Sequence, residues 1–221
     1  IALPGENFNT VLYVGNSTNP HAITGVGFQP DATWLKQRNN PTAYGHMLFD
    51  SIRGGTNYIV PNTTAAENDG TPSFGDQTLL TLDSDGFTLG TSDAINDDTY
   101  NHVSWNWKAG TTFDPTTDGS IASATGKSNS AAGFSIVKYT AENAVKTIGH
   151  GLSQAPTLIL QKTLVTGQWE CYYLREDGSD GVIFLDQLGA GEAANSGYWN
   201  DTNPTASVFT VGTGSGTGGA T

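Results

Sequence analysis

The chain has 221 residues and a mass of 23.2 kDa, which suits one large β domain or two small ones. Its 28 glycines, 30 threonines and 17 asparagines all disfavour helix interiors, so the composition excludes an all-α fold. With 9 basic against 21 acidic residues, the net charge of −12 argues against nucleic-acid binding and against docking on an anionic membrane, because both need clustered lysine or arginine.

Strands are the elements that the sequence predicts. Short runs of β-branched, aromatic and leucine residues are bounded by Gly, Pro, Asn and Asp, as is typical of turn-rich β proteins. In chain order, the runs of the first half are residues 11–14, 33–36, 79–82 and 87–89. Residues 83–86 (DSDG) predict a turn, because Gly86 tolerates a positive φ and aspartate side chains cap turn amides. Residues 64–67 (TAAE) predict a helical turn.

Residues 102–108 (HVSWNWK) alternate between polar and apolar side chains, which predicts a half-buried strand. Val103, Trp105 and Trp107 share one face of this strand. Large aromatic side chains in patterned strands are usually buried, so we expect Trp34, Trp105 and Trp107 to pack in a core.

The chain contains an internal repeat. Four matches occur in the same order at offsets of 122 to 126 residues. They join FNTVLY (8–13) to FSIVKY (134–139), ITGVGF (23–28) to IGHGL (148–152), TWLK (33–36) to LILQK (158–162), and FTLGT (87–91) to FTVGT (209–213). Residues 140–148 have a helix-like composition, but their partner, residues 14–23, contains Gly, Asn and Pro, so we expect a hairpin loop there.

We therefore predict two related units, over residues 1–110 and 133–213. Residues 111–132 form a Thr/Ser/Gly-rich connection, and residues 214–221 a flexible Gly-rich tail. Because no helical crossovers alternate with the strands, we expect antiparallel β-sandwiches of jelly-roll or lectin-like type with little or no helix. The second unit lacks a counterpart of the Trp105/Trp107 strand, so we expect an open edge or apolar face that another chain, or a longer version of this one, covers.

Two further features limit the class of protein. No apolar run reaches the length of a membrane-spanning helix, and the chain starts at Ile1 without a methionine or signal-like stretch, so we expect a fragment or a processed product. The single cysteine, Cys171, excludes an intrachain disulfide and a thiolate metal cage. Its apolar and aromatic neighbours favour a buried side chain over a reactive thiol.

The repeated strings carry a family resemblance. NTVLY-x-GN, ITGVGFQPD, LFDS-x-RG, NTTAAE, DSDGFTLGT and W-x-WKAG in the first half, with GFSIV-x-Y, IGHGL and YWN-x-T-x-P in the second, resemble a domain of marine and cyanobacterial phage virion proteins of the tail-fibre type. The resemblance runs through nearly the whole chain. It departs from the pattern at residues 169–191, where an acidic insert (REDGSDG) occurs, and at the truncated C-terminal end.

This resemblance implies a structural role in a tail fibre or other surface appendage, at the virion surface and outside the cell. It implies partners among other virion proteins and copies of the chain itself, with a trimer as the first expectation. It implies no reaction and supplies no catalytic residues. The alternative is a capsid or tail decoration protein without a ligand.

Exposed aromatic side chains are the candidates for ligand binding. Tryptophan faces offer flat apolar platforms for sugar rings, and Asn, Asp and Thr supply flanking hydrogen bonds. Trp199 lies with Tyr198 and Asn200 in a turn-rich segment (SGYWNDTNP), and Tyr44 lies in another (NNPTAYGH). We expect these side chains to be exposed and to contribute to recognition of host-surface polysaccharide.

Closely spaced aspartates raise the question of calcium. Asp83 with Asp85, and Asp177 with Asp180, place carboxylates around glycine-containing turns. A complete calcium-binding loop ends in a bidentate glutamate, and this chain has Ala94 at the corresponding position after Asp83. We therefore expect turn caps on an acidic surface and no bound cofactor, with calcium as the weaker alternative.

The sequence offers little support for catalysis. The four histidines are scattered without zinc-ligand spacing, and neither a G-x-S-x-G elbow nor a Walker loop occurs. Glycosidases need two neighbouring carboxyl groups, which Glu67 with Asp69, or Asp50 with another acid, would supply. We expect no enzyme, and a polysaccharide depolymerase is the alternative.

Overall fold

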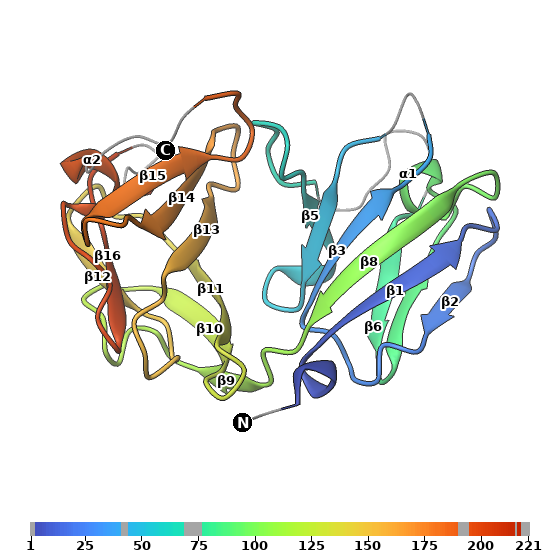
Figure 1. Cartoon of the computed structure of the whole chain (residues 1–221), viewed down its shortest axis with the longest axis horizontal. Coiled ribbons are helices and arrows are strands. Elements are labelled where there is room, and N and C mark those ends of the chain that lie inside the picture. The colour runs from blue at the N-terminus through green and yellow to red at the C-terminus, as the bar shows by residue number, and fades with distance from the viewer. Residues whose placement is uncertain (1–2, 41–43, 69–76, 190–194, 215, 218–221) are drawn as a thin grey trace. The chain divides into compact units, whose positions relative to one another are not determined.

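The computed structural model describes residues 3–40, 44–68, 77–189, 195–214 and 216–217 (Figure 1). Strands dominate these residues, and the helices are short: a 3-10 turn, η1 (Pro4–Glu6), and two four-residue helices, α1 (Asp93–Asn96) and α2 (Ser196–Trp199). The chain divides into two compact units. Unit 1 comprises residues 1–61 and 67–109, and unit 2 comprises residues 62–66 and 110–221.

Unit 1 is a sandwich of two antiparallel sheets. The larger sheet has the order β1-β8-β3-β4-β5 and the smaller the order β2-β7-β6. Leu35 and Phe49 of the larger sheet pack with Ile23 and Phe87 of the smaller in one core. The strands are β1 (Phe8–Val14), β2 (His21–Thr24), β3 (Ala32–Gln37), β4 (Met47–Asp50), β5 (Gly54–Ile59), β6 (Leu79–Asp83), β7 (Gly86–Leu89) and β8 (Asn101–Trp107).

Unit 2 contains three antiparallel sheets, with the orders β11-β10-β9, β13-β14-β15 and β12-β16. Its core includes Ile148, Tyr172, Trp199 and Phe209. The strands are β9 (Thr111–Phe113), β10 (Ala124–Asn129), β11 (Phe134–Tyr139), β12 (Lys146–Gly149), β13 (Leu158–Lys162), β14 (Trp169–Leu174), β15 (Asp180–Phe184) and β16 (Val208–Val211). The predicted all-β, antiparallel sandwich-like fold with little helix is confirmed.

The repeated sequences occupy corresponding strands in the two units: β1 and β11, β2 and β12, β3 and β13, β7 and β16. In unit 1 Ile23 pairs with Phe87, and in unit 2 its match Ile148 pairs with Phe209. Each unit therefore joins the second and the last of its matched strands in the same antiparallel pair.

The strand that the sequence analysis finds missing from unit 2 is present, but it precedes the unit's first matched strand instead of following the last. β10 pairs with β11 in the register in which β8 pairs with β1, since Phe8 lies opposite Trp107 and Phe134 opposite Asn129. Residues 111–132, predicted as a connection, thus contain strands β9 and β10. β11 is therefore paired within unit 2, and the expectation that another chain or a longer version of this one covers an open edge or apolar face stays a prediction. The sequence does not predict β10 (ATGKSN) as a strand because it has almost no apolar side chains.

The segment after β16 also has a counterpart, the segment after β7. Two backbone hydrogen bonds hold each. They are Gly212 N to Tyr198 O (2.6 Å) and Gly214 N to Gly197 O (2.7 Å) in unit 2, and Gly90 N to Thr78 O (2.7 Å) and Ser92 N to Gln77 O (3.1 Å) in unit 1. Thr217 is only 1% exposed. The predicted flexible tail is therefore bound to unit 2 as far as it is described, and residues 215 and 218–221 lie outside the described part.

The alternation in β8 is as predicted, but the expected core face is wrong. His102, Ser104 and Asn106 are fully buried on the core side, while Trp105 and Trp107 point to the other face and are half-buried. The polar side chains are tolerated inside because they bond to their neighbours: Asn106 accepts from Thr33 Oγ1 at 3.1 Å and donates to Ser104 Oγ at 2.9 Å.

Three local predictions have clear outcomes. The Asp83–Gly86 turn joins β6 to β7 as predicted, with Gly86 at φ 145°. Residues 140–145 form a loop, but it joins β11 and β12 of different sheets and is not a hairpin loop, and residues 146–148 belong to β12. The helical turn predicted for Thr64–Glu67 is wrong, because this segment is irregular. In the described part of the chain, no helix has the length and apolar character needed to cross a bilayer.

Candidate functional site

Four half-exposed aromatic rings gather on the face of the larger unit 1 sheet that points away from the core. This aromatic face consists of Phe8 on β1, Trp34 on β3, and Trp105 and Trp107 on β8. Residues that pair directly across antiparallel strands point to the same side, and Phe8 pairs with Trp107 while Trp34 pairs with Trp105. Their ring centroids are 5.2 Å and 6.3 Å apart. None of the four belongs to the unit 1 core.

Polar contacts fix the rim of the aromatic face. The indole N–H of Trp34 donates to Nδ1 of His46 at 2.9 Å, so this nitrogen is an acceptor and unprotonated. Burial, followed by the nearby charge of Lys36, lowers the pKa of His46. Lys36 Nζ donates to the backbone oxygens of Gln37 (3.1 Å) and Tyr44 (2.9 Å). The Lys36 ammonium is thus bonded to backbone carbonyls, and none of the residues named here has a carboxylate.

The aromatic face is a property of unit 1 alone. By the matched registers, the positions of Trp105 and Trp107 on β8 correspond to Lys127 and Asn129 on β10. The position of Trp34 corresponds to Leu160 on β13. Unit 2 thus has the corresponding strands without the tryptophans. The fold itself therefore does not require the aromatic face.

The predicted binding residues meet different outcomes. Tyr44 is exposed (47%) and is tied by its carbonyl to Lys36, beside the aromatic face. The expectation that Trp199 is exposed is wrong: it is 1% exposed in the unit 2 core, edge-on to Tyr172 at 5.8 Å. Tyr198 and Asn200 are half-buried beside it. The turn-rich composition of this segment led to the wrong expectation, because α2 places its last residue, Trp199, in the core.

The aspartates considered for calcium cap turns. Asp85 accepts from the amides of Gly25 (3.2 Å) and Gly27 (2.6 Å), and Asp177 accepts from the amide of Ser179 at 3.0 Å. Asp83 accepts from the Thr88 hydroxyl, and Asp180 is buried, with its pKa raised by burial. Among the residues that the structure describes, no three His, Cys, Asp or Glu side chains surround a metal position.

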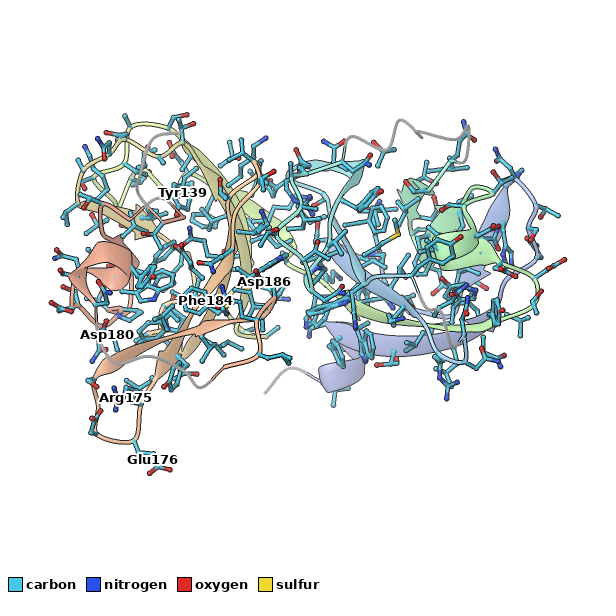
Figure 2. The ribbon with its side chains drawn as sticks, turned by 90° about the horizontal axis from the view of Figure 1, so that it is seen from above. Tyr139, Arg175, Glu176, Asp180, Phe184 and Asp186 are labelled. Carbon is cyan, nitrogen blue, oxygen red and sulfur yellow. The ribbon has the colours of Figure 1, made fainter. Side chains whose placement is uncertain are left out.

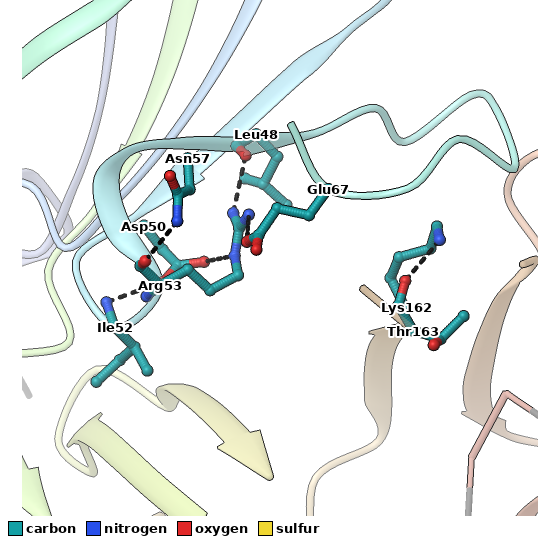
Figure 3. Close-up of polar contacts among 8 residues, drawn as sticks. All are labelled: Leu48, Asp50, Ile52, Arg53, Asn57, Glu67, Lys162 and Thr163. Carbon is teal, nitrogen blue, oxygen red and sulfur yellow. Dashed lines mark hydrogen bonds and ion pairs between the residues drawn. The ribbon is translucent and has the colours of Figure 1, made fainter. Parts of the chain in front are cut away.

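Two acids considered for glycoside hydrolysis meet at a single buried guanidinium (Figure 3). Arg53 Nε lies 2.5 Å from Asp50 Oδ2, and its Nη1 lies 3.0 Å from Glu67 Oε1. The Arg53 side chain is 6% exposed and also donates to the Leu48 carbonyl at 2.9 Å. This is an ion-pair network that closes the β4–β5 hairpin, and Asp69 lies outside the described residues.

Sequence reasoning missed one buried acid, Glu170 on β14, which is 4% exposed. Burial, with the charge of Asp186 as a second cause, raises the pKa of Glu170 to about 7. Asp186 follows β15, close to Phe184, which pairs with Glu170 (Figure 2). The neighbouring Cys171 is fully buried as predicted, and burial raises its pKa to about 12. The signal in the sequence is an acidic residue, Glu170, between Trp169 and Cys171 in a run with the composition of a buried strand.

The comparison with known families gives one match. A family described as "Domain of unknown function (DUF7483)" matches residues 3–221. The chain belongs to this family. The match spans both units of this DUF7483 protein. No curated protein and no solved structure matches the chain.

Proposed function

We propose that this DUF7483 chain is a structural module of a phage surface appendage, and that its aromatic face binds host-surface glycan. The observation that carries the proposal is the placement of Trp34, Trp105 and Trp107 on the side of the sheet away from the core. Exposed tryptophans have a hydration cost that a folded protein avoids unless a ligand or partner covers them. The paired rings, 5.2 Å and 6.3 Å apart and inclined at 49° and 77°, form an apolar surface on which the apolar face of a sugar ring can pack.

Charge supports a saccharide over other ligands. The chain carries a net charge of −12, which disfavours nucleic acid and anionic lipid. Next to the aromatic face, the His46 ring is neutral and the Lys36 ammonium is already bonded to two backbone carbonyls. We further propose that the two units are tandem copies of one ancestral unit, of which the first carries the ligand site. In a symmetric homo-oligomer, a trimer in this proposal, many weak sites on one particle raise the avidity.

Binding to an array of oligosaccharides and to whole-cell polysaccharide tests the ligand proposal. Trp105→Ala should weaken the binding of any array hit at least tenfold, because one of the two paired indoles is lost. Leu158→Ala removes an exposed apolar side chain from unit 2 and serves as the control, with no expected change. No binding by the natural chain, or equal binding by Trp105→Ala, overturns the proposal. Imaging of the particle with a labelled antibody tests the appendage position.

A decoration protein without a ligand is the second candidate. It is favoured by the edge strand β1, whose outward side chains Leu12 and Val14 are 60% and 57% exposed. Such an apolar row on an unpaired sheet edge suits a permanent protein contact. This candidate predicts that Leu12→Asn impairs incorporation into particles, whereas Trp105→Ala leaves both incorporation and adsorption to host cells unchanged.

A further inference from the structure

A buried acid and a buried amide face each other in the core of unit 2. Gln161 on β13 lies directly opposite Glu170 on β14, and the two side chains are 9% and 4% exposed. They are on the same side of the sheet as Tyr172, which is part of the core. The same two positions in unit 1 are Leu35 and Met47, which also pair directly and are apolar. Unit 2 therefore has a polar pair where the corresponding core is apolar.

When Glu170 is ionised, the Gln161–Glu170 pair has too few hydrogen-bond donors for its buried acceptors. Gln161 Nε2 donates to the backbone oxygen of Gly216, so the amide oxygen Oε1 points elsewhere as an acceptor. Neither this Oε1 nor Oε2 of Glu170 has a partner among the described residues, and both are buried. Two buried acceptors side by side are unfavourable, but one proton on the carboxyl group turns them into a donor and an acceptor.

The C-terminal strap, defined by Gly212, Gly214, Gly216 and Thr217, covers this pair. Gly216 packs so closely on the Glu170 carboxyl group that a Cβ at this position would overlap it. Thr217 is 1% exposed, and its backbone oxygen accepts from the Tyr139 hydroxyl at 2.7 Å. The strap has no ionisable side chain, so it offers no counter-charge to an ionised Glu170 beneath it.

We propose that Glu170 and Gln161 form a proton-binding site, in which the neutral carboxylic acid donates to Gln161 Oε1 and thereby locks the C-terminal strap onto unit 2. Loss of this proton places an uncompensated charge directly under Gly216, and the strap is released. The strap is thus closed in mildly acidic solution and open in alkaline solution. This inference does not depend on the ligand of the aromatic face.

The ionisable groups around the site act in the same direction. Asp186, beyond the end of β15, bears a negative charge and contributes, after burial, to the raised pKa of Glu170. From β11, Tyr139 presents its hydroxyl, whose pKa is raised by burial and then by Glu170. From β14 itself, Cys171 is a neutral thiol, with its pKa raised to about 12.

The one nearby ammonium does not offset the charge. Lys162 follows Gln161 on β13, so its side chain leaves the opposite face of the sheet. Its Nζ donates to the backbone oxygens of Thr163 and Val165, and its pKa is lowered by burial, which outweighs the opposing effect of Asp186 (Figure 3 shows the bond to Thr163).

Amide hydrogen exchange on the intact chain tests the lock. The amides of Gly212 and Gly214 donate to the backbone oxygens of Tyr198 and Gly197 outside the strap, so their protection, corrected for the intrinsic exchange rate at each pH, reports strap closure. We expect protection to fall about tenfold for each pH unit as the pH rises toward 7 and to level off above it, because Glu170 is then ionised whether the strap is closed or open. The amides of Gly90 and Ser92, their counterparts in unit 1, where the apolar Leu35–Met47 pair replaces Gln161 and Glu170, are the internal control and should keep their protection.

Two variants identify the proton. Glu170→Gln retains the shape and supplies a permanent N–H donor, so strap protection should become independent of pH between 6 and 8.5. Asp186→Asn removes the neighbouring negative charge, which makes the Glu170 carboxyl group easier to ionise.

Asp186→Asn should therefore lower the pH at which the strap opens, because the pKa of Glu170 falls without the negative charge of Asp186. Equal strap protection at pH 6 and pH 8.5 in the natural chain overturns the proposal. So does a pH-dependent loss that persists in Glu170→Gln, or an opening that Asp186→Asn moves upward. If Glu170→Gln does not fold, the natural chain and Asp186→Asn still decide between these outcomes.

Discussion

The hydroxyl of Tyr139 donates to the backbone oxygen of Thr217 at 2.7 Å, as the hydroxyl of its match Tyr13 donates to Ile95 at 2.9 Å. Ile95 and Thr217 are 122 residues apart, the offset of the β7 and β16 matches. In both units a partly buried tyrosine of the first matched strand thus holds the segment that follows the last one.

Removing either hydroxyl should destabilise its own unit. Tyr139→Phe and Tyr13→Phe each leave a carbonyl without its donor while keeping the ring in place, and each should lower the free energy of unfolding by about 1 kcal/mol. Urea unfolding followed by tryptophan fluorescence measures the change. Tyr44→Phe, at an exposed position, is the control and should be neutral. A neutral Tyr139→Phe would mean that the Thr217 carbonyl finds another donor.

The position of β10 makes a prediction about fragments. Residues 110–221 contain β9 and β10 together with all the other strands of unit 2 and should fold alone, whereas residues 133–221 lack the strand that pairs with β11 and should not. Circular dichroism and the cooperativity of thermal unfolding distinguish the two. A cooperative transition in the shorter fragment would show that β10 is dispensable for the unit 2 core.

Sequence reasoning located the repeated strands but could not assign their faces. Alternation in β8 identifies two faces and leaves open which one is inside, because the period of a strand is the same for both. Trp105 suggested a core by its size, yet Asn106 and Ser104 fill that side because cross-strand hydrogen bonds satisfy them. Such bonds depend on Thr33, some seventy residues away, which no local pattern reveals.

Composition misled for a related reason at β10 and at Trp199. β10 is held by strand pairing on both sides and needs few apolar side chains, so its threonine- and serine-rich sequence resembles a linker. Trp199 sits among turn residues, but the Asn195 side chain caps the α2 turn by accepting from the Gly197 amide at 2.9 Å. This cap turns the indole into the core, beside Phe209.

The Arg53 network should be essential for unit 1. Arg53→Ala leaves Asp50 and Glu67 without their shared counter-charge at a site where the arginine is 6% exposed, so the expected loss is about 3–5 kcal/mol. Arg53→Lys should recover only part of it, because an ammonium cannot bond two carboxylates and the Leu48 carbonyl with the same fork. Denaturant unfolding measures both, and Arg38→Ala, at an exposed position, is the control. A loss below 1 kcal/mol for Arg53→Ala would contradict this reading.

The stability of unit 2 should fall as the pH rises through neutrality. The pKa of Glu170 is about 7 in the folded chain against an ordinary value of 4.5, so the folded state holds the proton more tightly than the unfolded state. The stabilisation is therefore complete below pH 4.5 and is lost as the pH rises through 7, by about 3 kcal/mol in total. Buried histidines act oppositely: burial lowers the pKa of His150, which costs stability below its ordinary pKa. Calorimetry of the fragment 110–221 should thus show a maximum in mildly acidic solution, and Glu170→Gln should remove the decline on the alkaline side while leaving the acidic side unchanged. A decline of equal size in Glu170→Gln would assign it to a different group.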